Sequence, residues 1–265
     1  MTAPHVVVLL KDILDPELPG SRFRVDREAR QPAEGLGPSI LGPFERSALE
    51  LALKLKDAVG ARVTALSVGD GGAVDGLRKA LAVKVDEAVQ VSVGRAADLD
   101  SGRTAELLLA ALGRLADVDL VLAGRQAGDW DHGQVGYLLA EGLGWPCVGL
   151  VRQVWFEGDE LRVRHDHAGG QQVVSIQPPA VLTVTNDDAL LLRMARVNDL
   201  MAAQRRPITR WDAAELGAAA GAGPGLEIAD LWVPEHESVC EIIEGDDPSD
   251  IAINAVRRLQ ELKLL

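Results

Sequence analysis

Cysteines are scarce in this sequence, and no apolar run is long. The two cysteines, Cys147 and Cys240, lie in unrelated contexts. Two thiols do not make a disulfide framework, and no Cys/His spacing typical of zinc sites surrounds them. The apolar run from Val6 to Leu10 ends at Lys11, too soon for the core of a signal peptide, and no segment approaches the roughly 20 residues of a membrane span. We therefore expect a cytoplasmic protein that does not insert into a membrane.

Basic residues are also in deficit. The chain has 27 lysines and arginines against 40 aspartates and glutamates, which gives a net charge of −13. Nucleic acids and anionic lipid surfaces attract proteins largely through lysine and arginine. The charge therefore disfavours nucleic acid and acidic membrane surfaces as partners, and most of the acidic excess is explained by solubility.

Aromatic residues make up only 3% of the chain, whereas 47% of its residues are hydrophobic and 27 are glycine. Such chains fit helices packed on a parallel sheet better than a β-sandwich. Short apolar runs alternate with segments that have apolar residues at helical spacing. We expect strands at residues 6–10, 61–69, 86–93 and 118–124, and helices at 43–59, 73–83, 104–116 and 133–143. This order predicts an α/β fold with a doubly wound, mostly parallel sheet.

The pattern changes after this first part. Residues 148–176 alternate apolar and polar side chains, which predicts a β-hairpin excursion with one solvated face. A buried strand at 178–185 and a helix at 190–204 follow. We assign residues 1–214 to the main domain, the Ala/Gly-rich residues 215–227 to a flexible linker, and residues 228–265 to a C-terminal arm. The arm is expected to hold a short strand-like piece at 228–234 and a final helix capped by Asp247 or Ser249.

Ligands of open α/β sheets bind at the carboxyl ends of the strands, where loops and helix N-termini meet. Three loops qualify by position: Lys11-Asp12, residues 69–72 and residues 124–136. The third loop, GRQAGDWDHGQVG, contains four glycines that let backbone N–H groups approach phosphate, and it contains Arg125 and two glutamines that can bind polar groups. These residues alone leave two interpretations open, a nucleotide site and an ordinary glycine-rich turn.

Other kinds of site have less support. His165 and His167, or the DWDH run at 129–132, could be metal ligands, but no third ligand accompanies them and a solvated strand face is the better interpretation. The sequence has no GxSxG elbow, no Walker A loop and no GxGxxG fingerprint. Because no residue stands out as an acid, base or nucleophile, the sequence favours a carrier over a hydrolytic or group-transfer enzyme.

The 124–136 loop resembles the adenine-nucleotide loop of electron transfer flavoprotein beta subunits, which reads G-[KR]-Q-A-x-D-x-D-x-x-Q-x-G. The likeness continues over nearly the whole chain, in VVVLLKDILD (6–15), PSILGPFERSALELALKLK (38–56), LRKALAVKVDEAVQV (77–91) and LGWP (143–146). The resemblance implies an adenine-nucleotide-binding, Rossmann-like domain with a β-hairpin excursion and a C-terminal arm that contacts an alpha subunit. It implies an electron-transfer subunit with no independent hydrolytic or transferase site.

The resemblance also implies which residues contact the nucleotide. By matching positions they are Leu9, Gly42, Pro43, Phe44, Glu45, Val68, Gly124, Arg125, Gln126, Ala127, Asp129, Asp131, Gly133, Gln134 and Val135. The sequence departs from the family pattern in this region. Gly42 stands where the family has asparagine, and Trp130 and His132 replace a usual small or polar pair.

The resemblance leaves two nucleotides open for this site. Conventional members have Asn-Gln-Thr on the phosphate of AMP, whereas this chain has Gly133-Gln134-Val135. This ending, the EGLGPSI run at 34–40 and the EIIEGDDP run at 241–248 look more like the electron-bifurcating branch, in which the same site holds a second FAD. We expect FAD, with structural AMP as the alternative, and a further FAD in the alpha subunit.

Residues 186–206 resemble the segment through which the family docks on dehydrogenases. Arg193, Leu200, Met201 and Ala203 match the family's pattern, and Val197 stands in place of an anchoring leucine. The docking residues are therefore expected to be Arg193, Val197, Leu200 and Met201. A helix packed on its own domain is the other interpretation of this segment. The resemblance implies a flavin dehydrogenase as partner, such as an acyl-CoA dehydrogenase, or a quinone oxidoreductase. A nucleotide-binding module like the stress proteins, with no redox role, is the alternative of another class.

Overall fold

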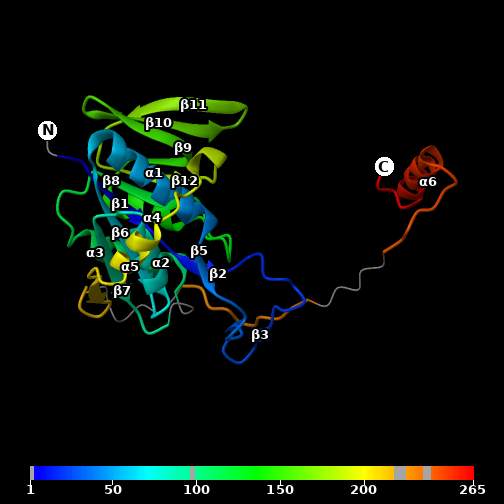
Figure 1. Cartoon of the computed structure of the whole chain (residues 1–265), viewed down its shortest axis with the longest axis horizontal. Helices are drawn as coiled ribbons and strands as arrows, with labels where there is room; N and C mark the ends of the chain where they lie inside the picture. Colours follow the sequence, from blue (N-terminus) through cyan, green and yellow to red (C-terminus); the bar gives the residue numbers. More distant parts are fainter. Residues whose placement is uncertain (1–2, 96–98, 218–224, 235–239) are drawn as a thin grey trace. The chain divides into compact units, whose positions relative to one another are not determined.

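The computed structural model describes the chain except residues 1–2, 96–98, 218–224 and 235–239. It contains two compact units, Met1–Leu231 and Trp232–Leu265. The larger unit is built on a nine-stranded sheet in the order β11-β10-β9-β12-β8-β1-β6-β7-β13 (Figure 1). The strands are β1 (His5–Leu9), β6 (Arg62–Gly69), β7 (Glu87–Ser92), β8 (Leu120–Gly124), β9 (Cys147–Glu157), β10 (Glu160–His167), β11 (Gly170–Ile176), β12 (Ala180–Val184) and β13 (Thr209–Asp212).

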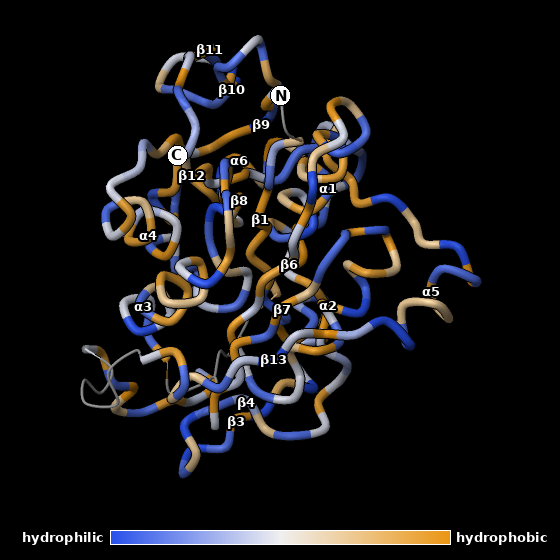
Figure 2. The backbone as a smooth tube through the Cα atoms, turned by 90° about the vertical axis from the view of Figure 1, so that its left-hand side faces the viewer, coloured by the Kyte–Doolittle hydropathy of each residue, from blue (hydrophilic) through white to orange (hydrophobic). Residues whose placement is uncertain are grey.

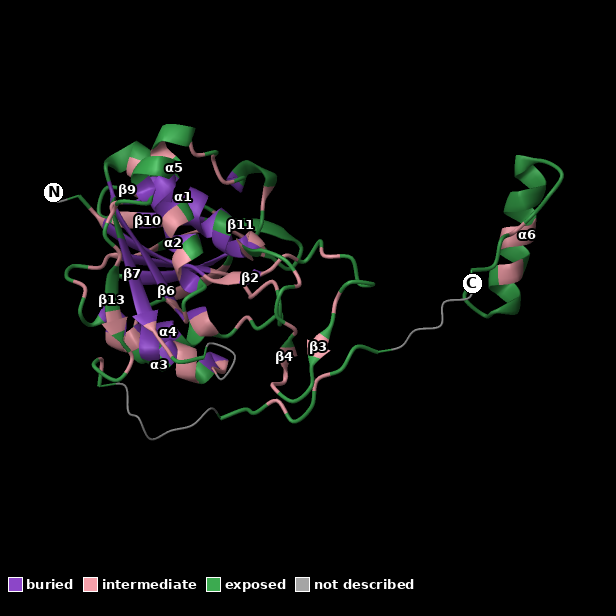
Figure 3. Cartoon of the chain, turned by 60° about the horizontal axis from the view of Figure 1, so that its bottom comes forward, coloured by how far each residue is buried: buried purple, intermediate pink, exposed green. Residues whose placement is uncertain are grey.

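The central strands are parallel, and four helices cover the two faces of the sheet. Helices α1 (Pro43–Val59) and α2 (Ala73–Ala82) share one apolar core with Val6 and Val8, whereas α3 (Ser101–Leu112) and α4 (Val135–Leu143) share another with Val7 and Leu9. Successive residues of β1 therefore face opposite layers, as the period of a strand requires. Figure 2 shows the central strands as the most hydrophobic part of the tube, and Figure 3 shows them buried. The predicted doubly wound α/β sheet is confirmed.

Most predicted boundaries agree with the structure to within two residues. Helix α3 is an exception, because it begins three residues before the predicted Thr104. The carboxylate of Asp100 accepts the backbone N–H of Arg103 at 2.7 Å and so caps the helix earlier. The 148–176 excursion forms β9 to β11, which extend the main sheet through parallel pairing of β9 with β12. Its buried residues, among them Leu161 and Val163, join the core on the α1 side.

The predicted helix at 190–204 is confirmed only in its second half. The structure has a 3-10 turn, η2 (Asp188–Leu190), then irregular chain, then the short helix α5 (Val197–Ala203). Hydrogen bonds and ion pairs to α1 explain the difference. Lys54 donates to the carbonyl oxygen of Ala189, and Arg193 pairs with Glu50, so the chain between η2 and α5 follows α1. The predicted strand-like piece at 228–234 is also wrong, because its residues that the structure describes form no strand.

A long insertion, residues 10–42, separates β1 from α1. Its base is a two-stranded ribbon of β2 (Asp12–Leu14) and β5 (Ser39–Leu41), and further along lie β3 (Val25–Asp26) and β4 (Gln31–Pro32). Two arginines of the insertion hold the end of the larger unit. Arg27 pairs with Asp230 at 2.6 Å, and Arg30 pairs with Glu227 at 2.7 Å.

The described residues of the smaller unit form one helix, α6 (Pro248–Glu261), which begins where the final helix was predicted. Asp247 is its cap and accepts the N–H groups of Ser249 and Asp250. None of the residues of α6 is buried, and apolar side chains such as Ile253 on the helix and Leu262 at its end are exposed. A helix of this length gains little stability in water unless an apolar face is covered. None of the helices in the described part of the chain is long and apolar enough to cross a membrane.

Candidate functional site

The direction in which the chain crosses the sheet reverses between β1 and β8. From β1 the chain passes through α1 to β6 on one side, whereas from β8 it passes through α4 toward β9 and β12 on the other. Open α/β sheets bind ligands outside the carboxyl ends of strands at such a switch point. The loops after β1 and β8 meet there, because Lys11 forms an ion pair with Asp129 at 2.8 Å. Both loops were predicted as candidates.

Two glycines let the 124–136 loop lie directly on the start of α1. A Cβ at Gly124 would lie 2.9 Å from the Cβ of Phe44 and 3.2 Å from the backbone nitrogen of Glu45. A Cβ at Gly128 would lie 2.9 Å from Pro43 and from Ile13. Real Cβ contacts are rarely so short, so these positions exclude larger residues. At these two positions a glycine is needed so that the loop can pack on α1 and β2. From the sequence alone, the glycines were explained only by the approach of the backbone to phosphate.

The N-terminus of α4 points its free backbone groups at the same edge. Its N-cap residue is Gln134, and no side chain caps it. Inside the loop, Asp131 adopts a left-handed conformation with φ 54° and accepts a hydrogen bond from the amide of Gln126 at 2.7 Å. The loop is therefore ordered by its own side chains, while the first N–H groups of α4 stay available. Such groups carry partial positive charge and favour phosphate.

Arg125 adds a cation beside this helix start. Its guanidinium lies over the ring of Phe44, 5.0 Å from the ring centre, and its Nε donates to Gln126 at 2.9 Å. In the described part of the chain Arg125 forms no ion pair, so its remaining N–H groups can bind an anion.

The other predicted nucleotide residues lie at the same edge. Leu9 ends β1, and Val68 lies near the end of the neighbouring strand β6, so both offer apolar surface. Gly42 is the N-cap residue of α1, and its N–H donates to the carbonyl oxygen of Lys11. The structure thus brings together in one place Leu9, Gly42, Pro43, Phe44, Val68 and the loop residues Gly124, Arg125, Gln126, Ala127, Asp129, Asp131, Gly133, Gln134 and Val135.

Glu45 is a predicted nucleotide-contacting position whose burial sequence reasoning did not foresee. It lies in the first turn of α1 and is only 6% exposed. Burial raises the pKa of its carboxyl group to about 7. Its Oε2 atom has no hydrogen-bond partner among the described residues. The family resemblance included Glu45 among the contacting positions, but nothing in the sequence pattern indicated that its carboxylate is buried.

The predicted docking residues lie on a separate surface. Val197, Leu200 and Met201 are 72%, 43% and 60% exposed, and the neighbouring Met194 is 95% exposed. Arg193 differs from them, because its guanidinium lies 2.9 Å from Glu50 and 2.9 Å from Asp57, both on α1. Arg193 therefore holds the segment on the domain, while α5 presents an apolar surface to solvent.

An Arg193→Met variant is expected to lower the free energy of unfolding by about 2 kcal/mol. The side chain of Glu50 is only 7% exposed, and the change leaves its charge without the guanidinium. Breaking a buried pair from one side costs several kcal/mol, and the partial exposure of Arg193 reduces this because water can enter. Urea unfolding measures the effect. Arg196→Met is the matched control, since Arg196 is exposed and forms no ion pair with a described residue; an equal loss in both variants would contradict this role of Arg193.

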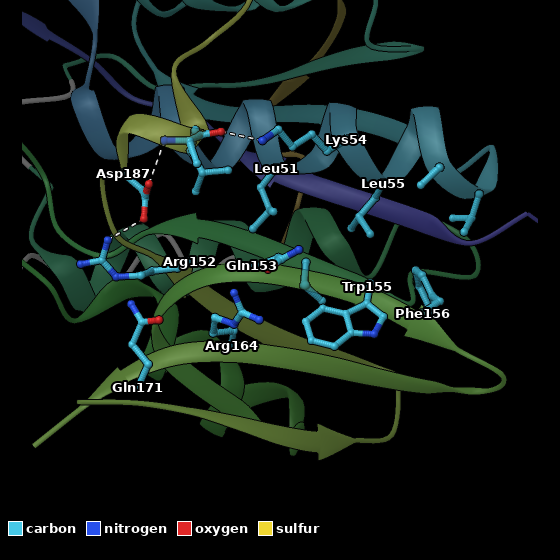
Figure 4. Close-up of a pocket in the computed structure, with 15 residues that line it drawn as sticks. Leu51, Lys54, Leu55, Arg152, Gln153, Trp155, Phe156, Arg164, Gln171 and Asp187 are labelled. Atoms are coloured by element: carbon cyan, nitrogen blue, oxygen red, sulfur yellow. Dashed lines mark hydrogen bonds and ion pairs between the residues drawn. The ribbon is translucent and has the colours of Figure 1, made fainter. Parts of the chain in front are cut away.

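A concave region lies along the middle of α1, away from the switch point (Figure 4). This cleft of about 470 Å³ is bounded by Leu51 and Leu55 of α1 and by Trp155 of β9. The guanidinium of Arg152 at one end already pairs with Asp166 and Asp187. The cleft contains neither a glycine-rich loop nor a helix N-terminus, so it lacks the free backbone N–H groups that the start of α4 offers at the switch point. Within the described ranges, no group of three potential ligands could hold a metal ion, at His165, His167 or elsewhere.

Comparison with known proteins gives a family match over most of the chain. The model of the electron transfer flavoprotein domain matches residues 34–216. These residues include the start of α1, the 124–136 loop and the segment that carries α5.

Relatives cover still more of the sequence. The chain is 35% identical to the electron transfer flavoprotein subunit beta of Clostridium acetobutylicum over 213 residues, which are 80% of each chain. It is 33% identical to the caffeyl-CoA reductase-Etf complex subunit CarD of Acetobacterium woodii over 86% of this chain and 88% of that protein. It is 29% identical to the acryloyl-CoA reductase electron transfer subunit gamma of Anaerotignum propionicum over 80% of this chain and 84% of that protein.

Proposed function

The chain belongs to the electron transfer flavoprotein family as a beta subunit, and from that premise we propose that it binds FAD at the switch point between β1 and β8. It is an electron-transfer subunit. In our proposal it pairs with an alpha subunit that carries a further FAD, and the heterodimer passes electrons between a dehydrogenase and an acceptor. Bound FAD would supply the redox chemistry, and the protein would position it.

The observation that supports this site most strongly is the uncapped start of α4 beside Arg125. The free N–H groups and the guanidinium offer several donors to phosphate oxygens at the carboxyl edge of the sheet. Val135, the first residue of α4, has no hydroxyl that could serve the terminal oxygens of a monophosphate. A diphosphate that continues toward a flavin has no such terminal group, so the residues present favour FAD over AMP.

The partner proposals depend on two exposed apolar surfaces. Helix α6 has no buried residue, and an alpha subunit that covers its apolar side chains would account for this. The apolar surface of α5 is proposed to contact a flavin dehydrogenase. The names of two relatives place them with caffeyl-CoA reductase and acryloyl-CoA reductase, which supports a partner of the acyl-CoA dehydrogenase type.

The flavin content of the heterodimer tests the proposal. The chain is purified with its alpha subunit, and nucleotides are released by heat and separated by chromatography. Two FAD and no AMP per heterodimer are expected. One FAD and one AMP would overturn the FAD assignment and favour the conventional arrangement, in which AMP occupies the site. Recovery of no nucleotide from this chain would overturn the site itself.

A further inference from the structure

Two basic side chains without an acidic partner line the cleft between α1 and the strands β9 and β10 (Figure 4). Lys54 lines it from α1, where its ammonium donates to the carbonyl oxygen of Ala189, and Arg164 lines it from β10. Among the described residues, no carboxylate forms an ion pair with Lys54 or with Arg164. The chain as a whole carries a net charge of −13, so two unpaired cations at one cleft indicate that it accepts an anion.

The third cation of the cleft, Arg152, is already neutralised by the protein. Its guanidinium pairs with Asp166 at 2.7 Å and with Asp187 at 2.5 Å. Because Asp187 is the N-cap residue of η2, these ion pairs fix η2 beside β9 and order this end of the cleft. Arg152 and its two aspartates together leave one negative charge, and Lys54 and Arg164 add two positive charges. The cleft therefore keeps a surplus of one positive charge.

The opposite end of the cleft is apolar. Figure 4 shows Arg152 at one end of the cleft and Trp155 and Phe156 of β9 at the other. Both aromatic side chains are half-buried, and Val59, at the end of α1, is 42% exposed. The rise along α1 from Lys54 to Val59 is about 7.5 Å, at 1.5 Å per residue. An apolar chain attached to the anion can therefore lie along α1 and remove this surface from water.

We propose that this cleft binds a small monocarboxylic acid with an apolar chain. The carboxylate pairs with Arg164 and is attracted by Lys54, and the chain lies against Val59 and Trp155. The cleft volume of about 470 Å³ is within the range of small-molecule sites, roughly 300–1,000 Å³. The inference goes beyond the proposed electron-transfer function and does not depend on the nucleotide site.

A carboxylate suits the cleft better than a phosphate does. Phosphate sites commonly use the free N–H groups of a helix N-terminus or a glycine-rich loop, and the cleft contains neither. A guanidinium binds a carboxylate through charge-assisted hydrogen bonds, and Arg164 is available for them. The surplus of one positive charge also matches an acid that carries one negative charge.

Isothermal titration calorimetry on the heterodimer, with its nucleotide bound, tests the proposal with octanoate as the probe. Octan-1-ol has the same chain without the carboxylate, and butyrate has the carboxylate on a shorter chain. Octanoate is expected to bind roughly tenfold more tightly than octan-1-ol, or better, as for a hydrogen bond between charged groups. It should exceed butyrate by roughly tenfold or more, because its additional methylene groups leave water.

Arg164→Gln should lower the affinity for octanoate roughly tenfold and leave the affinity for octan-1-ol unchanged. Arg162→Gln is the matched control. Arg162 lies on the same strand, but it pairs with Glu157 and Glu160 and does not line the cleft, so this variant should bind octanoate as wild type does. Equal losses in the two variants would overturn the inference, because the effect would then be one of overall charge.

Two results on wild type would overturn the inference without any variant. One is octan-1-ol that binds as tightly as octanoate. The other is no binding of octanoate to the heterodimer, which is the result expected if the alpha subunit covers the cleft. Arg164 lies away from the switch point, so nucleotide content should stay at the wild-type level in both variants, and failure of the acid site leaves the proposed function standing.

Discussion

A Gly133→Val variant is expected to leave the heterodimer with less than a tenth of the nucleotide that wild type retains in this site. A Cβ at Gly133 would lie 3.0 Å from the carbonyl oxygen of Arg125 and 3.6 Å from the Cβ of Gln126. The backbone of Gly133 is not left-handed, so valine is compatible with its φ and the conflict is one of space. The loop must shift, and the shift moves Arg125 and the start of α4 away from the phosphate position. Loss of two charged hydrogen bonds, at roughly 1.5–3 kcal/mol each, would weaken binding at least hundredfold.

Nucleotide content after heat extraction measures the effect, and circular dichroism checks that the fold is kept. Gly113→Val is the matched control. Gly113 ends α3, and a Cβ there would make only ordinary contacts of 3.6 Å, so this variant should keep its nucleotide. Full nucleotide content in Gly133→Val would contradict the assignment of the phosphate to this loop.

Val197→Asp is expected to slow electron transfer to the dehydrogenase at least thirtyfold while flavin content stays unchanged. Val197 is 72% exposed and is the first residue of α5. An aspartate in the first turn of a helix is favourable, so the helix itself should persist. At the centre of an interface, however, an unpaired charge would be desolvated, and such central positions cost about 2 kcal/mol or more when disrupted.

The measurement is kcat/KM for the heterodimer as electron acceptor of its dehydrogenase. Val173→Asp provides the control, because Val173 is an exposed valine of β11, outside the 186–206 segment. An equal reduction in both variants would indicate a general effect of added charge. Loss of flavin in Val197→Asp would show that α5 belongs to the core, and the docking assignment would then be wrong.

Much of the fold could be predicted because its strands and helices have strong periodic patterns. Helix α1 has the predicted bounds, since Pro43 suits a first helical position and apolar residues recur along the helix at its period. Strand β13 was missed. Its sequence, TRWD, has no apolar run, and it exists because it pairs with β7 at the edge of the sheet. The break before α5 was missed for a similar reason, because it depends on the ion pair between Arg193 and Glu50, residues far apart in the sequence.

The candidate site could likewise be predicted only in part. Its location followed from the rule for open α/β sheets and from the family motif in the 124–136 loop. Its internal contacts did not, because they join residues of different loops. The ion pair of Lys11 with Asp129 connects positions 118 residues apart, and the buried oxygen of Glu45 depends on packing against Gly42. Local pattern has no access to such contacts.

The arginines of the insertion have a consequence for the end of the larger unit. Arg27 and Arg30 hold residues 227–230 through ion pairs whose side chains are largely exposed. Exposed ion pairs weaken as the salt concentration rises, because mobile ions screen the charges. The attachment of residues 227–230 to the insertion is therefore expected to depend on ionic strength, whereas the apolar cores of the sheet are not.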